Sequence, residues 1–142
     1  TGNDNFGYID ADDDLNNMDV VQDGDSNDGE IYMQGDGNVY SISQNGDDKE
    51  AEIRAFGNYS DFSIDQSGSG EHYAKIYASG YADNNDASIT QTGSGDHYIR
   101  LNFYTDDYNV TASQSGVTNK SITVSYNCVT NCNKTVTIAQ SD

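Results

Sequence analysis

A repeat with a period in the low twenties constrains this chain more than any other feature. A glutamine recurs at intervals of 22, 22, 25, 23 and 26 residues. The six positions are Gln22, Gln44, Gln66, Gln91, Gln114 and Gln140. Each glutamine ends a short segment in which apolar and polar residues alternate, a pattern typical of a β-strand. Strand repeats of this period are typical of a solenoid, in which each repeat buries its apolar face only against its neighbours.

A turn and a second alternating segment follow each of the first five glutamines. The turn carries a glycine two residues after the glutamine, where the chain can reverse with a positive φ at no steric cost. These glycines are Gly24, Gly46, Gly68, Gly93 and Gly116. Each repeat therefore predicts a strand, a turn and a strand, and the longer intervals place their extra residues in the connections.

Branched aliphatic residues occupy the inward positions of both predicted strands. Two residues before the glutamine stand Val20, Ile42, Ile64, Ile89 and Ile138, with Ala112 in the remaining repeat. The middle of the other strand holds Ile9, Ile31, Ile53, Ile76, Leu101 and Val124. We expect these side chains to form a core between two sheets about 10 Å apart, with strands stacked every ~4.8 Å.

The sequence predicts an all-β fold, a parallel β-solenoid of about six strand-turn-strand layers. The chain opens on a strand around Ile9 and closes on one around Ile138, so six strands of each kind would stack as two facing parallel sheets. This arrangement is a cross-β stacking like that of amyloid. We expect residues 1–142 to form one such domain.

Composition alone would suggest disorder, because only 34% of residues are hydrophobic and the net charge is −18. The strict alternation argues for a folded chain, since it buries most apolar side chains, and the absence of proline suits stacked strands. Carboxylates outnumber basic residues by 24 to 6, which disfavours nucleic-acid binding. No stretch is apolar enough to insert into a membrane, and no signal peptide is visible, so we expect Thr1 to begin a mature or trimmed form.

The sequence offers no convincing catalytic constellation and predicts no cofactor. The two histidines, His72 and His97, occupy equivalent places in adjacent repeats, each after a carboxylate (Glu71 and Asp96). Stacked in neighbouring layers, they could share a zinc or copper ion. Duplication of a polar turn explains the pair equally simply, and we favour it.

The two cysteines lie in the longest connection, residues 127–133. Cys128 and Cys132 have no other cysteine with which to pair. A short disulfide-closed loop, which suits an oxidising extracellular setting, is favoured over free thiols or metal ligation.

The glutamines are polar residues at inward positions. A buried amide is costly unless its donors and acceptors are paired, and stacking identical amides layer on layer pairs them along the axis. The sequence therefore predicts a structural glutamine ladder. A second polar row lies six residues before the glutamine, at Asn16, Asn38, Ser60 and Asn85.

The repeat Ser/Asn-x5-Gln-x-Gly, clearest in residues 60–68 and 38–46, resembles the curlin repeat of curli fibre subunits over essentially the whole chain. The resemblance implies a secreted subunit that polymerises into extracellular functional amyloid for biofilm and adhesion. It also implies a nucleating subunit and a dedicated secretion machinery as partners. The second glutamine usual in curlin repeats is replaced here by Met33, Ala55, Ala78, Phe103 and Tyr126, which leaves open whether the chain is a major or a nucleating subunit.

We therefore expect a structural protein and not an enzyme, a subunit that assembles head to tail through the open strand edges at its ends. The alternative is a monomeric secreted β-solenoid that binds a surface, ice or a glycan, through one flat face. An ice-binding face would carry regular threonine pairs, whereas the outward row here mixes serine, threonine and aspartate.

Overall fold

The structure is a computed structural model of the whole chain. It describes residues 1–12, 16–35, 39–57, 60–69, 71–79, 85–94, 96–104, 107–117, 119–128 and 133–142. The described secondary structure consists of the strands β1 (Gly7–Asp12), β2 (Asp28–Gln34), β3 (Ile42–Ser43), β4 (Lys49–Phe56), β5 (Asp61–Gln66), β6 (His72–Ser79), β7 (Asn85–Gln91), β8 (His97–Tyr104), β9 (Tyr108–Gln114), β10 (Lys120–Tyr126) and β11 (Lys134–Gln140).

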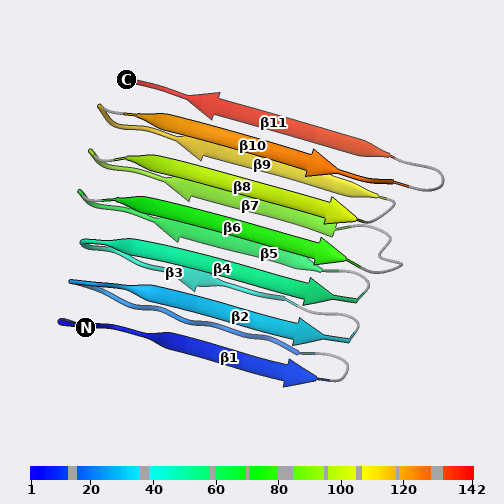
Figure 1. Cartoon of the computed structure of the whole chain (residues 1–142), viewed down its shortest axis with the longest axis horizontal. Helices are drawn as coiled ribbons and strands as arrows, with labels where there is room; N and C mark the ends of the chain where they lie inside the picture. Colours follow the sequence, from blue (N-terminus) through cyan, green and yellow to red (C-terminus); the bar gives the residue numbers. More distant parts are fainter. Residues whose placement is uncertain are drawn as a thin grey trace.

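The strands form two parallel sheets that face each other. Sheet A has the order β1-β2-β4-β6-β8-β10, and sheet B has the order β11-β9-β7-β5-β3. Successive strands of the chain therefore alternate between the sheets, and each turn of the chain stacks on the one before it, with the two termini at opposite ends of the stack (Figure 1). The predicted parallel β-solenoid is confirmed.

The solenoid completes about five turns, fewer than the six layers that the repeat predicts. Sheet B has five strands because the segment around Val20 makes an isolated bridge, Asn17 to Val39, and no regular strand. Its backbone still follows the neighbouring layer, since the Met18 amide donates to the Val39 carbonyl at 3.0 Å. This segment lies at the end of the stack, where a strand has one neighbour and half the ladder bonds of an interior strand.

The register places equivalent repeat positions directly above one another. In sheet A, one column runs through Ile9, Ile31, Ile53, Ile76, Leu101 and Val124. In sheet B, Ile42, Ile64, Ile89, Ala112 and Ile138 form the facing column. The interior members are at most 1% exposed, so the alternation buries the side chains that the sequence assigns to the core.

The predicted core is incomplete at its ends. Ile138 is 49% exposed although it points inward, and Ile9 and Val124 are only partly buried against the core. These side chains are exposed because each has a stacked neighbour on only one side along the solenoid axis. The core assignment of Ile138 is therefore wrong for the isolated chain.

Aromatic side chains fill the part of the core where two facing positions hold only alanine. Ala78 and Ala87 are small residues on opposite sheets, and their stacked neighbours are Phe103 and Phe62. The two phenylalanine rings meet edge to face, with centroids 6.4 Å apart. Large side chains of adjacent layers thus occupy the volume that two alanines leave, which keeps the interior close-packed.

Candidate functional site

The glutamine ladder runs along one edge of the core. The Nε2 of Gln22 donates to the Oε1 of Gln44 at 2.6 Å, Gln44 donates to Gln66 at 2.8 Å, and Gln66 donates to Gln91 at 2.7 Å. All glutamines from Gln44 to Gln114 are at most 1% exposed. Each of these hydrogen bonds between layers pairs a buried amide group. Without a partner, such a buried group would cost about 1 to 3 kcal/mol.

The ladder reverses direction near the C-terminal end. Gln140 donates its Nε2 backwards to the Oε1 of Gln114 at 2.9 Å, whereas the first three bonds point forwards. At the same place the buried Nε2 of Gln91 has no hydrogen-bond partner. The end of the stack therefore leaves one buried amide donor unsatisfied in its interior.

A third polar column, of which the sequence pointed only to the two histidines, lies at the turns between the sheets. It lies four residues before the central aliphatic residue of each sheet A strand and consists of Asn5, Asn27, Lys49, His72, His97 and Lys120. Every one of these side chains carries an N–H donor, which is the signal that could have revealed the column.

In five layers this donor reaches back to a backbone carbonyl of the preceding segment. The bonds are Asn5 Nδ2 to Thr1 O (3.1 Å), Asn27 Nδ2 to Gly24 O (3.0 Å), Lys49 Nζ to Asp47 O (2.5 Å), His72 Nε2 to Gly68 O (3.0 Å) and His97 Nε2 to Gly93 O (2.8 Å). Lys120, in the last layer, forms an ion pair with Asp142 instead. We refer to these six residues as the turn-sealing column.

Burial shapes the electrostatics of this column. Lys49 is 2% exposed, and burial lowers its pKa, although the charges of Asp47 and Asp48 act in the opposite direction. Burial, with the positive charge of Lys49 and the neighbouring His97, lowers the pKa of His72 to about 4. His72 is therefore neutral at physiological pH and donates through Nε2.

The lowered pKa of His72 predicts a loss of stability in mild acid. The unfolded state binds a proton below pH 6.5, whereas the folded state binds it only near pH 4, so stability falls as the pH drops through this window. Between pH 7 and pH 5 the wild type should lose about 2 kcal/mol of unfolding free energy through this residue. Asparagine occupies the equivalent place at Asn27, so His72→Asn should keep the turn bond and abolish this loss.

The measurement is urea unfolding of freshly prepared protein at pH 7 and pH 5. All other ionisable groups are the same in the two proteins, so the difference between wild type and His72→Asn isolates His72. An equal loss of unfolding free energy in the two proteins would contradict the assignment.

The structure brings the two histidines together as the sequence predicts. Their rings stack with centroids 4.6 Å apart, and both residues are buried. Each Nε2 already bonds a turn carbonyl, and the described residues contain no group of three or more histidine, cysteine or acidic side chains that could hold a metal ion. The pair therefore supports the turns, and we do not propose a metal site.

Of the two cysteines, Cys128 is disulfide-bonded. Cys132 lies outside the described residues. Among the described residues the structure contains no free cysteine.

The turn glycines fall into two groups. Gly68, Gly93 and Gly116 have positive φ angles of 83°, 104° and 107°, as expected from the sequence. In the two earlier turns, which are one residue shorter, the positive φ lies on Asp25 (70°) and Asp47 (48°), so the expectation was wrong for Gly24 and Gly46. Aspartate tolerates this left-handed conformation better than most residues.

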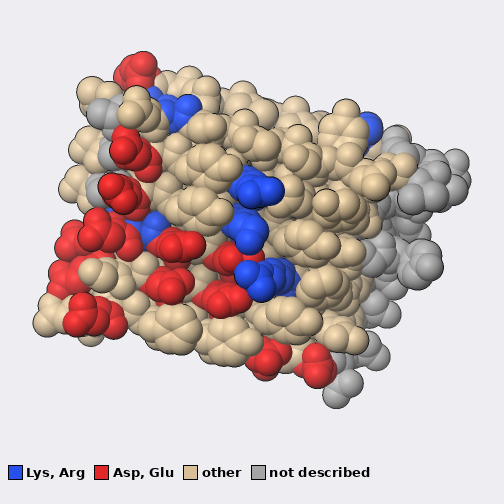
Figure 2. All heavy atoms as spheres, viewed as in Figure 1, with Lys and Arg blue, Asp and Glu red and all other residues tan. Residues whose placement is uncertain are grey.

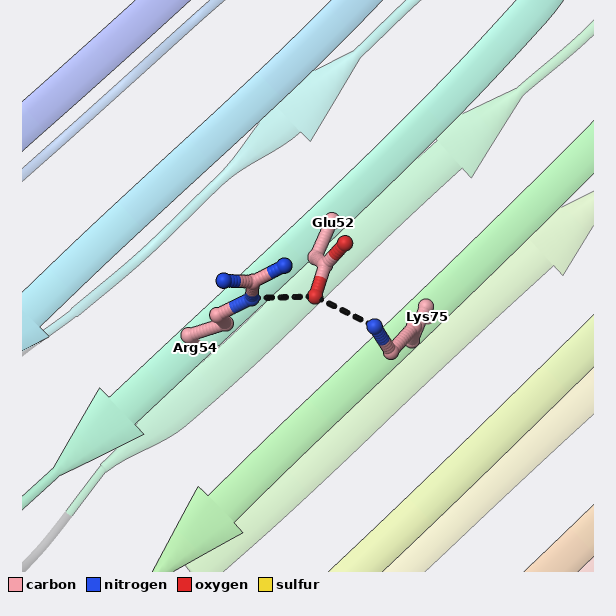
Figure 3. A network of polar contacts seen from close by, with 3 residues as sticks. All are labelled: Glu52, Arg54 and Lys75. Atoms are coloured by element: carbon pink, nitrogen blue, oxygen red, sulfur yellow. Dashed lines mark hydrogen bonds and ion pairs between the residues drawn. The ribbon is translucent and has the colours of Figure 1, made fainter.

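The outward face of sheet A carries a compact charge network. Glu52 accepts from the Arg54 side chain on its own strand and from Lys75 Nζ, at 2.6 Å, on the next strand (Figure 3). Burial raises the pKa of Glu52, but the hydrogen bonds from Arg54 and Lys75 outweigh it and hold the pKa below its ordinary value. This network lies between β4 and β6, where Glu52 is paired in register with Lys75.

The two end layers expose inward-facing side chains that are covered elsewhere in the stack. At the C-terminal end, Val136 is 39% exposed and Tyr126 is 54% exposed, and an open hollow is lined by Lys120 and Gln140. At the N-terminal end, β1 is the edge strand of sheet A. The C-terminal end therefore presents an apolar strip beside an unpaired strand edge, whereas at the N-terminal end Ile9 and Ala11 are partly buried and Val20 is 9% exposed.

No protein-family model matches the chain, and neither a curated protein nor a solved structure matches it. The described part of the chain contains strands and no helix that could cross a membrane.

Proposed function

We propose that this chain is a structural subunit of an extracellular, curli-like amyloid fibre that assembles head to tail for biofilm matrix and adhesion. The partner is then another copy of the chain. The curlin resemblance adds a nucleating subunit, a dedicated secretion machinery and an extracellular location to the proposal. The observation that carries it is the match between the two open ends of the solenoid.

The inward rows of the two ends fit each other in size. Suppose that β10 of one copy pairs with β1 of the next in the same register that neighbouring strands of sheet A have within one copy. Ile122 then stacks on Gly7, Val124 on Ile9 and Tyr126 on Ala11. Large side chains thus meet small ones in two of the three pairs. In sheet B, the same step places Ile138 of one copy over Val20 of the next. The exposed side chain of Ile138 would then be covered on both sides.

Continuing the stack would also repair the glutamine ladder. If the amide of Gln140 turned over to donate to Gln22 of the next copy, the Oε1 of Gln114 would be free to accept from Gln91. Every glutamine would then donate in the same direction, and the unsatisfied Nε2 of Gln91 would gain a partner. A buried unpaired amide costs about 1 to 3 kcal/mol, so this repair favours addition of a further copy.

Electron microscopy and fibre diffraction of the purified chain test the proposal. We expect unbranched fibres with a ~4.8 Å repeat along the axis, since strands would continue across each joint at the same spacing. Discrete particles at all concentrations would contradict it and favour the alternative, a monomeric solenoid that binds ice or a glycan through a flat face.

A chain-terminating variant tests the direction of growth. Thr137→Pro removes a backbone donor and distorts β11, while the layers below it can still fold. At a small fraction of the wild-type concentration it should shorten fibres by adding through its intact N-terminal layer and then blocking growth. Thr137→Val, which keeps the donor, is the control. A folded Thr137→Pro variant without effect at this dose would argue against head-to-tail joints.

A further inference from the structure

The outward face of sheet A is segregated by charge along the solenoid axis. Its central row runs, layer by layer, through Tyr8, Glu30, Glu52, Lys75, Arg100 and Thr123. Two acidic residues are thus followed by two basic ones, with an uncharged residue at each end. Figure 2 shows basic groups in the middle of this face and acidic groups clustered over its N-terminal layers, with further acidic groups along the left edge up to the C-terminal layers.

Half of the basic residues of the chain gather on this face. Arg54, Lys75 and Arg100 lie on it, out of 6 lysines and arginines against 24 carboxylates. Arg100 is exposed and forms none of the ion pairs found among the described residues. At the acidic end, burial raises the pKa of Glu50, and the charges of Asp28 and Glu52 raise it further. The face therefore carries an uncompensated cation at one end and crowded carboxylates at the other.

Aromatic rings run beside the charged row across four layers. Tyr32, Phe56, Tyr77 and Tyr104 form a zigzag in which successive ring centroids lie 5.6, 5.7 and 5.5 Å apart. The first three are half-buried, and Tyr104 is 45% exposed. Aromatic residues and arginine are the side chains most enriched in protein interfaces.

We propose that this face binds the same face of a second copy of the chain, with a twofold axis parallel to the strands and running between β4 and β6. The rotation keeps the strand direction and reverses the order of the layers. Glu30 of one copy then lies opposite Arg100 of the other, and Glu52 lies opposite Lys75. Each pair occurs twice, because a twofold contact uses the same patch on both copies.

The flanking rows are complementary under the same rotation. Glu50 and Asp28 lie opposite Tyr73 and Tyr98, whose hydroxyls can donate to carboxylates. In the next row, Arg54 lies opposite the ring of Tyr77, a cation–π arrangement. No two like charges of the same row face each other.

The size of the face suits a specific contact. Six strands spaced ~4.8 Å apart make the face roughly 29 Å long, and a strand of 7 residues with a rise of ~3.3 Å per residue makes it about 23 Å wide. The area of the face is therefore about 670 Å² per copy. Stable interfaces bury about 800 Å² of solvent-accessible surface per partner. The accessible surface of this face is larger than its flat area, because the side chains make it uneven. This contact does not depend on the head-to-tail joint. In a fibre it would pair two filaments that run in opposite directions.

Charge reversal at Glu30 and Arg100 tests the proposal. Arg100→Glu places a glutamate opposite Glu30 of the other copy, and Glu30→Arg places an arginine opposite Arg100. Within its own chain, however, the new glutamate lies beside Lys75 and the new arginine beside Glu52, so both variants should fold. Each single variant should weaken the dimer about tenfold or more, and Glu30→Arg combined with Arg100→Glu should restore it to near the wild-type value.

Sedimentation velocity of freshly prepared protein at low ionic strength is the measurement. A twofold contact closes at the dimer, whereas head-to-tail addition gives an open series of oligomers, so the two modes are distinguishable. The control is Ser63→Asp with Thr111→Asp on the outward face of sheet B, which changes the net charge by the same −2 as Arg100→Glu. This control should leave the dimer unchanged.

Two results would overturn the proposal. The first is a wild type that stays monomeric or forms only an open series; if that monomer binds alginate and Arg100→Glu abolishes the binding, the face is a surface for an acidic polysaccharide. The second is a double reversal that fails to restore a dimer lost in the single variants.

Discussion

Ile76→Asp is expected to prevent the chain from folding. Ile76 is fully buried in the middle of the stack, between Ile53 and Leu101 in the same column. Removing the isoleucine side chain costs about 2 to 5 kcal/mol, and protonating the aspartate at pH 7 so that it can stay in a dry core, against an ordinary pKa of about 3.9, costs roughly a further 4 kcal/mol. The sum approaches the whole stability of a typical domain, about 5 to 15 kcal/mol.

Circular dichroism and urea unfolding measure this effect. Thr111→Asp is the matched control, because Thr111 is an exposed, outward-facing residue of β9 and receives the same carboxylate. We expect the control to keep the β-sheet signal and to lose less than about 0.5 kcal/mol. Similar losses in the two variants would show that the inward and outward faces had been assigned wrongly.

Gly93→Ala is expected to have the second largest effect. A Cβ at this position would lie 1.9 Å from the Gly68 carbonyl oxygen of the layer below, and the φ of Gly93 is 104°. Backbone fills the space, so the clash can be relieved only if the stacked turns separate. The Gly93 carbonyl also accepts the bond from His97, so separation would disturb the turn-sealing column as well. We expect a loss of several kcal/mol of unfolding free energy or failure to fold.

Gly24→Ala is the control for this prediction. A Cβ at Gly24 meets nothing within 4 Å, and the positive φ in that turn belongs to Asp25. The substitution should be neutral or slightly stabilising, by up to about 1 kcal/mol, because alanine restricts the unfolded chain. Unfolding experiments on the two variants under the same conditions give the comparison. Equal effects would mean that the close stacking of the later turns is not the reason for their glycines.

The sequence by itself determined the fold and the identity of most core residues. Alternation along a strand has a period of two, so a residue such as Ile53 or Ile89 has only one face on which it can be buried. A glutamine in the same inward pattern must find a polar partner, and its own copy in the next layer is the nearest one. The ladder therefore follows from spacing alone, before any coordinate is known.

The tertiary structure decided what depends on neighbours along the axis. Ile138 carries the same sequence signal as Ile89, yet it is exposed because no layer covers it. Lys49 looks like an ordinary polar turn residue in the sequence, and only the stacking register shows that it shares one buried column with His72. The charge pairing proposed for the outward face of sheet A needs the same register. A linear pattern specifies which way a side chain points, whereas the order of the layers specifies what lies above and below it.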